Sequence, residues 1–318
     1  NVMFPPLNRD NHNVLQYLKD YKPQTEGQKL RILLHGPVGA GKSSFINSIQ
    51  SVLQGRIYRQ ALVESSTDNN DGNSYDSFTK KYTTYKVSKG GPERVCSFVF
   101  NDIMGLELKG VLVDDIKLAL KGHVKDGYTF SAAVPEISAD RDVPCTGRPP
   151  DFTFILKLAP YQRLTCTFNP VSKMSEQDQF YNNSPSNNDK VHVLVCVVPG
   201  STVAHIKDEV VRKIREIRKE ASDLGIPQLA VITKIDEVCP EIKEDVKNVY
   251  KSKLMKAKME EFSAQVGIPM NCIFPVKNYY EENNVNSDIN SLILDSLRGI
   301  IHSGDDYFEH QMTQTDSD

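Results

Sequence analysis

The chain has 318 residues, 39% hydrophobic and 25% charged, which is enough for one large globular domain or two small ones. Its net charge of -3, with basic residues interleaved among acidic ones, argues against direct binding to nucleic acid. The longest apolar run, residues 191–198, is too short to cross a bilayer, so we expect no membrane span and a soluble protein. Six cysteines without a Cys-x-x-Cys pair indicate reduced thiols and no zinc site. Because the chain begins at Asn1 rather than Met, an upstream domain or signal is left open.

The apolar patterns, taken in chain order, alternate between helical and strand periods. A glycine-rich turn at residues 89–92 joins two strands into a hairpin, which we place at the sheet edge. The predicted helices are residues 14–21, 44–53, 114–120, 202–224, 243–266 and 288–302. The predicted strands are residues 30–35, 83–87, 95–101, 191–198, 229–232 and 271–275. This alternation predicts an α/β fold with a mainly parallel sheet and helices on both faces.

A glycine-rich loop of the form Gly-x-x-x-x-Gly-Lys-Ser lies between the first predicted strand and the helix that follows it. Glycines let a backbone wrap closely around a triphosphate, and the amides at the helix N-terminus point at its oxygens. We expect Lys42 to neutralise β- and γ-phosphate charge and Ser43 to hold Mg²⁺. The predicted phosphate-binding residues are Gly36, Gly39, Ala40, Gly41, Lys42, Ser43 and Ser44.

A second motif, Asp-Ile-Met-Gly at residues 102–105, ends the predicted strand at 95–101. In nucleotide hydrolases of this kind, such an Asp reaches Mg²⁺ through a water molecule and such a Gly amide meets the γ-phosphate. We therefore expect Asp102 to bind the metal through water and Gly105 to contact the nucleotide.

A third motif selects the base. Residues 233–236 read Thr-Lys-Ile-Asp after a buried strand and resemble the Asn/Thr-Lys-x-Asp motif with which GTPases read guanine. Asp236 can accept hydrogen bonds from N1–H and the exocyclic amine of guanine, which adenine does not present in that pattern, while the stem of Lys234 packs on the ring. Together with Thr233, these residues predict a P-loop GTPase domain with GTP or GDP and Mg²⁺ as cofactors.

Two weaker elements complete the predicted site. Thr79 is our choice for the switch hydroxyl that contacts Mg²⁺ and the γ-phosphate, and the alternative is a plain edge-strand threonine. Lys277 and Asn278 occupy the loop in which GTPases offer a backbone amide to guanine O6, and the alternative is a surface loop.

Several short sequence segments are more specific than the general GTPase motifs. They are residues 102–107, 114–116, 120–128, 168–170, 277–279, 297–298 and 305–306. From about residue 10 to about residue 310, the chain resembles the interferon-induced protein 44 family. The resemblance implies a cytoplasmic protein of the innate immune and antiviral response that binds GTP.

Residues 131–167 depart from this resemblance, because the phrase that stops at Phe130 continues at Phe168. The tract is Pro-rich and irregular, although residues 152–158 have a strand pattern. A lineage-specific loop and an unspliced piece of gene model are both open explanations. We therefore predict a helical lead-in at 1–28, a G domain at 29–304 with 131–167 as an irregular insertion, and an acidic tail at 305–318.

The prospects for GTP hydrolysis depend on three positions. Leu106 stands where Ras-like enzymes have a water-orienting Gln, and Val38 would crowd an arginine finger. Glu107 is the candidate catalytic residue, with a solvated switch residue as the alternative. We expect slow or partner-dependent hydrolysis, and a homodimer across the nucleotide face is one route that large GTPases use.

Two functional hypotheses follow. One is a GTP-dependent switch, and the other is a scaffold in which GTP is a structural ligand and an unidentified protein partner matters more. A third reading, an ATP-binding kinase-like or chaperone-like protein, is disfavoured by Asp236.

Overall fold

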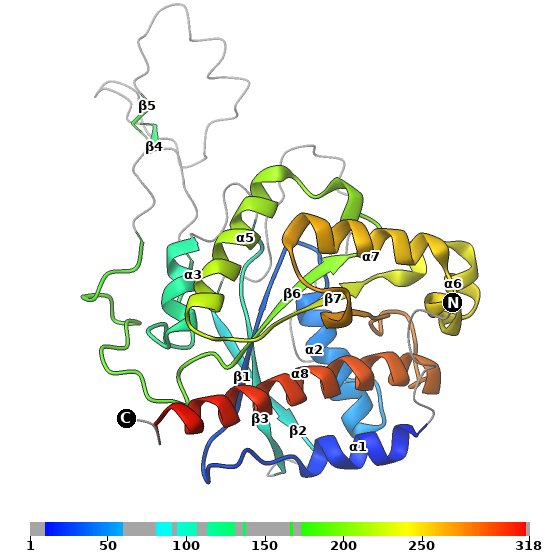
Figure 1. Ribbon diagram of the computed structural model, residues 1–318, viewed down its shortest axis with the longest axis horizontal. Helices are drawn as coiled ribbons and strands as arrows, with labels where there is room; N and C mark the ends of the chain where they lie inside the picture. The colour runs from blue at the N-terminus through cyan, green and yellow to red at the C-terminus, as the bar shows by residue number, and fades with distance from the viewer. Residues whose placement is uncertain are drawn as a thin grey trace, which may run out of the picture.

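The computed structural model describes residues 10–59, 81–90, 94–106, 113–130, 136–137, 166–167 and 173–315. Its centre is a six-stranded sheet in the order β2-β3-β1-β6-β7-β8 (Figure 1). The strands are β1 (Leu30–His35), β2 (Thr83–Ser88), β3 (Val95–Asp102), β6 (Val193–Pro199), β7 (Gln228–Thr233) and β8 (Ile273–Pro275). All neighbouring pairs are parallel except β2 and β3, which form the predicted hairpin at the sheet edge. The prediction of a mainly parallel α/β sheet is therefore confirmed.

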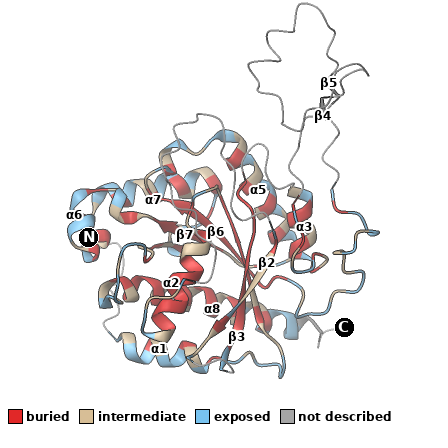
Figure 2. Ribbon diagram, turned by 180° about the vertical axis from the view of Figure 1, so that it is seen from behind, coloured by how far each residue is buried: buried red, intermediate tan, exposed pale blue. Residues whose placement is uncertain are grey.

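Helices cover both faces of this sheet (Figure 1). One layer contains α1 (Asn11–Asp20), α2 (Lys42–Gln54) and α8 (Ser287–Thr315). The other contains α3 (Val113–Leu120), α5 (Asp208–Asp223) and α7 (Lys253–Val266), while α6 (Pro240–Glu244) is a short helix near α7. The central strands β1, β6 and β7 are almost continuously buried, whereas the edge strand β2 is mostly of intermediate exposure, as Figure 2 shows. The near-uniform apolar character of these central strands is what a parallel sheet covered on both faces requires.

Two glycines bring α8 close to the sheet. A Cβ atom on Gly304 would lie 2.4 Å from Leu30 Cδ1 in β1, and one on Gly299 would lie 2.4 Å from Phe274 Cζ in β8. Both distances are shorter than any van der Waals contact, so larger residues would push the helix outward. The helix thereby closes the core under the strands that carry the predicted site.

Helix α8 also corrects a predicted boundary. We predicted that the last helix ends at residue 302 and that an acidic tail begins at 305, but the helix continues to residue 315. Tyr21 Oη donates to Asp305 Oδ1 at 2.7 Å, and Phe308 is buried against His192 with ring centroids 4.8 Å apart. These distant partners extend the helix through a stretch that reads as a solvated tail.

Two other predicted helices are interrupted. The helix predicted at 202–224 starts as a short 3₁₀ turn, Val203–His205, and α5 itself begins at Asp208. The helix predicted at 243–266 is divided into α6, a 3₁₀ turn and α7. The second division has a local cause, because the Ser252 side chain accepts from the Met255 amide and so starts α7 afresh.

The segments that precede and follow the predicted insertion contact each other. Val124 and Tyr181 form an antiparallel bridge, and the buried Asp115 accepts from both Tyr128 Oη and the Met174 amide at 2.9 Å each. Inside the tract, β4 (Glu136–Ile137) pairs antiparallel with β5 (Cys166–Thr167). The strand pattern at 152–158 lies outside the described residues. That 131–167 is an insertion, and the division into domains, remain predictions.

The described helices include none that combines the length and apolar character needed to cross a membrane.

Candidate nucleotide-binding site

The predicted site residues gather at one edge of the sheet. Strands β1, β3, β7 and β8 run parallel, so the loops after their carboxyl ends lie at the same edge. In open α/β sheets this edge is where ligands bind. The phosphate loop follows β1, Asp102 ends β3, Thr233 ends β7, and Lys277 and Asn278 follow β8.

The phosphate loop is shaped for a ligand that approaches its backbone. A Cβ on Gly36 would lie 2.0 Å from Val197 O, and Gly39 and Gly41 have positive φ angles of 68° and 86°. Gly41 is the N-cap of α2 and supplies no side-chain hydrogen bond to the first turn. The helix N-terminus therefore presents backbone N–H groups that a phosphate can accept from.

Lys42 lies along the inside of this loop and is 7% exposed. Its Nζ donates to Gly36 O at 3.3 Å and to Pro37 O at 3.0 Å. These two carbonyls hold the ammonium group at the phosphate loop, where its charge would face a nucleotide's phosphates.

Ser43 and Asp102 meet at the predicted metal position. Ser43 Oγ donates to Asp102 Oδ2 at 2.5 Å. Asp102 is fully buried, and its other oxygen, Oδ1, has no hydrogen-bond partner within the described part of the chain. Burial raises the pKa of the Asp102 carboxyl, while Lys42 and the Ser43 hydroxyl oppose that rise. A buried carboxylate with one unsatisfied oxygen beside a hydroxyl fits a hydrated Mg²⁺.

The peptide after Asp102 rests on the phosphate loop. A Cβ on Gly105 would lie 2.3 Å from Val38 Cγ2 and 2.5 Å from Val38 N, so no larger residue fits there. The next amide, Leu106 N, donates to Gly36 O at 3.2 Å. Leu106 itself is completely buried in the hydrophobic core. The residue at the position of the Ras-like Gln therefore contributes to the core rather than to the site.

Two side chains tie the predicted base-reading loops to the phosphate loop. Thr233 Oγ1 donates to Ala40 O at 2.6 Å, and Asn278 Nδ2 donates to Gly41 O at 3.1 Å. The Asn278 Oδ1 atom is buried without a hydrogen-bond partner among the described residues. Thr233 and Asn278 thus position the loops.

Lys234 has a φ of 53°, an unusual value for a residue other than glycine. Strain of this kind costs on the order of 1–2 kcal/mol and is typical of functional loops.

A chain of charges lies at the base-reading end. Lys277 Nζ is 3.9 Å from Asp236 Oδ2 and 2.8 Å from Glu282 Oε1. Although partial burial opposes it, the hydrogen bond from Lys277 lowers the pKa of Glu282. Sequence reasoning missed Glu282, because it lies beyond the recognised motif and no pattern in the loop marks it.

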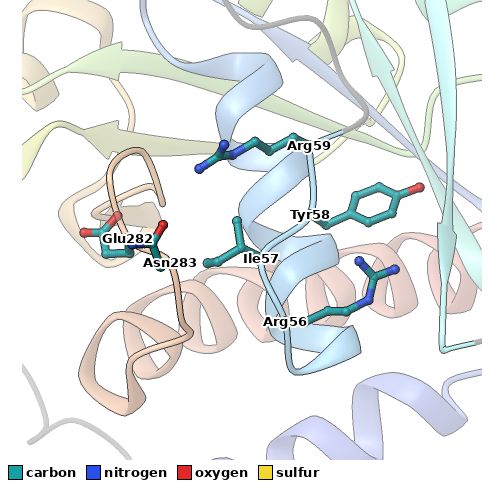
Figure 3. A pocket seen from close by; sticks show the side chains of 6 residues that line it. All are labelled: Arg56, Ile57, Tyr58, Arg59, Glu282 and Asn283. Carbon is teal, nitrogen blue, oxygen red and sulfur yellow. The ribbon is translucent and has the colours of Figure 1, made fainter.

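A pocket of about 500 Å³ adjoins this end of the site. It is lined by Arg56, Ile57, Tyr58, Arg59, Glu282 and Asn283. Figure 3 shows the Ile57 and Arg59 side chains directed toward the loop that carries Glu282, whereas Arg56 and Tyr58 extend to the other side. The Glu282 carboxylate therefore borders both the pocket and the Lys277 ammonium group.

Thr79 and Glu107, which we predicted as switch and candidate catalytic residues, lie outside the described residues. The structure brings together the phosphate loop, Asp102, Gly105, residues 233–236 and Lys277–Asn278. Their roles toward a nucleotide remain predictions.

Comparison with known proteins shows which family this chain resembles. No family model matches the chain. Interferon-induced protein 44 of Mus musculus is 31% identical over 299 residues, which cover 93% of this chain and 60% of that protein. Interferon-induced protein 44-like of Homo sapiens is 28% identical over 306 residues, covering 95% of this chain and 58% of that protein. The predicted resemblance to the interferon-induced protein 44 family is confirmed. The chain spans about 60% of the length of these curated relatives.

Among solved structures, the chain is similar to Toc33 from Arabidopsis thaliana. A dimerization-deficient mutant of Toc33 is 14% identical with a TM-score of 0.44, covering 92% of this chain and 90% of that one. Toc33 in complex with GDP and Mg²⁺ is 13% identical with a TM-score of 0.39, covering 92% and 89%. A probable GTP-binding protein engB is 12% identical with a TM-score of 0.34, covering 86% and 97%. The strand order and the strand–loop–helix arrangement described above agree with the predicted α/β fold class with a phosphate loop after its first strand.

Proposed function

We propose that this chain binds GTP and GDP together with Mg²⁺, discriminates against ATP, and acts as a nucleotide switch with slow or partner-dependent hydrolysis. The observation that carries the proposal is that Thr233 and Asn278 fasten both base-reading loops to the carbonyls of the phosphate loop. The two halves of a nucleotide site are thereby held in one arrangement.

In this site, Lys42 and the N-terminal amides of α2 would bind the phosphates, and Gly105 would offer its amide to the γ-phosphate. Mg²⁺, where bound, would neutralise phosphate charge, with Ser43 as a direct ligand and Asp102 holding it through water. Asp236 would accept from guanine N1–H and the exocyclic amine. These groups bind and orient the nucleotide, but the buried Leu106 supplies no hydrogen bond to an attacking water.

Calorimetric titration with GTP, GDP and ATP in Mg²⁺ tests the proposal. We expect binding of both guanine nucleotides, loss of triphosphate binding in Lys42→Ala and Ser43→Asn, and weak or no binding of ATP. Equal affinity for ATP and GTP, or unchanged GTP affinity in either variant, would refute it.

The second candidate is a scaffold in which bound GTP is not turned over. The burial of Leu106 favours it, because the position that orients water in Ras-like enzymes is committed to the core. Limited proteolysis in GDP and in a non-hydrolysable GTP analogue separates the candidates. Different cleavage patterns support a switch, and identical patterns support a scaffold.

The names of the relatives support a further proposal about the induction, location and role of the protein in the cell. We propose that the protein is interferon-induced, cytoplasmic and part of the innate immune and antiviral response, and that it acts through an unidentified protein partner or a homodimer across the nucleotide face. Transcript levels after interferon treatment, with fractionation of the tagged protein, test its induction and location. Sedimentation in GDP and in a GTP analogue tests the dimer.

A further inference from the structure

Three charged side chains form a row at the base-reading end of the site. Lys277 lies between Asp236 and Glu282, with 3.9 Å to the first carboxylate and 2.8 Å to the second. All three side chains are between 22% and 29% exposed, so most of their surface is shielded from water. Ion pairs in such surroundings are screened less than surface pairs.

Glu282, and not Asp236, fixes the position of the Lys277 ammonium group. The 2.8 Å contact to Glu282 is a charge-assisted hydrogen bond, and the second Glu282 oxygen accepts from the Tyr280 amide at 2.9 Å. At 3.9 Å, Asp236 is beyond hydrogen-bond distance from the same ammonium group. Asp236 therefore accepts no hydrogen bond from Lys277.

This row of charges is complementary to the edge of guanine. The edge presents an acceptor at O6, then donors at N1 and at the exocyclic amine. A carboxylate that accepts from N1–H leaves O6 a few ångströms to one side, within reach of an ammonium group 3.9 Å from that carboxylate. Adenine presents a donor at position 6 and an acceptor at N1, so it would face a like partner at both positions.

We propose that the Lys277 side chain reads guanine O6 while Asp236 reads N1–H and the exocyclic amine, and that Glu282 positions Lys277 for this contact. The inference rests on the proposed guanine-nucleotide function and adds a charged reader to it. It differs from a role for the backbone of the same loop, because it assigns recognition to Lys277 Nζ.

Lys277→Met tests the inference, since methionine keeps most of the stem and removes the charge. Binding of GTP and of inosine triphosphate, which also has O6, should weaken about tenfold to a hundredfold, the range for a hydrogen bond to a charged group. A third probe, 6-thio-GTP, keeps N1–H and the exocyclic amine but replaces O6 with a poor acceptor. The wild-type chain should prefer GTP over 6-thio-GTP, and Lys277→Met should lose most of that preference.

Two further variants keep the test decisive. Lys256→Met, on α7 where the lysine pairs with Glu260, is the matched control and should leave all affinities unchanged. Glu282→Gln should reduce the preference for GTP over 6-thio-GTP without abolishing guanine binding, which supplies the answer if Lys277→Met does not fold.

The outcomes separate this inference from the function on which it rests. If Lys277→Met binds GTP as tightly as the wild type, or more tightly, Lys277 is only a counter-ion of Asp236 and the inference is wrong. An unchanged preference for GTP over 6-thio-GTP in both Lys277→Met and Glu282→Gln would also overturn it. If the wild-type chain binds no guanine nucleotide, or binds ATP equally well, the proposed function itself fails.

Discussion

Replacing Leu106 with glutamine should destabilise the protein without creating a fast GTPase. The substitution introduces the residue that Ras-like enzymes use to orient water, so the position of residue 106 after the Asp-Ile-Met-Gly motif by itself favours a gain of activity. The structure predicts the opposite, because Leu106 is completely buried and its amide is bonded to Gly36 O. The side chain at this position packs in the core.

The expected cost follows from burial. A buried amide left without partners costs about 1–3 kcal/mol, and replacing a packed leucine forfeits part of the roughly 1.5–3 kcal/mol of its burial. We therefore expect the free energy of unfolding to fall by about 3 kcal/mol. Leu254→Gln is the matched control, because Leu254 is 48% exposed and the same change there should stay within about 0.5 kcal/mol.

Urea denaturation of both variants measures the stabilities, and single-turnover GTP hydrolysis measures the activity. Wild type and Leu106→Gln should both hydrolyse GTP slowly, at a rate on the order of 10⁻⁴ to 10⁻³ per second. A Leu106→Gln protein that is as stable as wild type and hydrolyses GTP at least tenfold faster would show that residue 106 faces the nucleotide.

Three further predictions concern the base, the insertion and the response to acid. Asp236→Asn should shift preference from guanine toward xanthine nucleotides, because the amide can donate to the xanthine oxygen; titration with both nucleotides checks this, and retained GTP selectivity would contradict it. Deleting residues 131–167 should preserve folding and GTP affinity, and an insoluble deletion variant would show that the tract is an integral part of the fold. By contrast, Asp115→Ala should lower the free energy of unfolding by about 1–3 kcal/mol, because it leaves the Tyr128 hydroxyl and the Met174 amide without an acceptor. Burial lowers the pKa of His192 from its usual value of 6.5 to about 4. As the pH falls below 6.5, the unfolded chain therefore takes up a proton on this histidine before the folded protein does. The free energy of unfolding consequently falls as the pH drops from 6.5 toward 4. Lowering the pH from 7.5 to 5 should cost about 2 kcal/mol through this residue, and His192→Gln should show a shallower pH dependence in denaturation experiments.

The parts of the fold that the sequence predicts are those determined by residue patterns within a short segment. The strand at residues 30–35 and the edge hairpin have the predicted places, because apolar runs and a glycine-rich turn determine them over a few residues. The phosphate loop likewise lies between a strand and a helix, as its motif requires.

The features that sequence could not predict depend on distant partners. The last helix passes residue 302 because Asp305 and Phe308 pack against Tyr21 and His192, which lie far away in the chain. The burial of Leu106 and the contact of Glu282 with Lys277 are likewise visible only once the loops are assembled. No periodicity within one segment encodes such contacts.

The assembled site suggests how base recognition and phosphate sensing are divided. The proposed base-reading loops are fastened to Ala40 and Gly41 through Thr233 and Asn278, so those loops cannot move apart from the phosphate loop without breaking one buried and one partly buried hydrogen bond. GDP and GTP share the base, and they differ only at the γ-phosphate. The peptide at Gly105 lies against Val38 at van der Waals contact, with no room for even a methyl group. A γ-phosphate that draws the Gly105 amide toward itself must therefore rearrange this contact, and the base-reading loops would stay in place while it does.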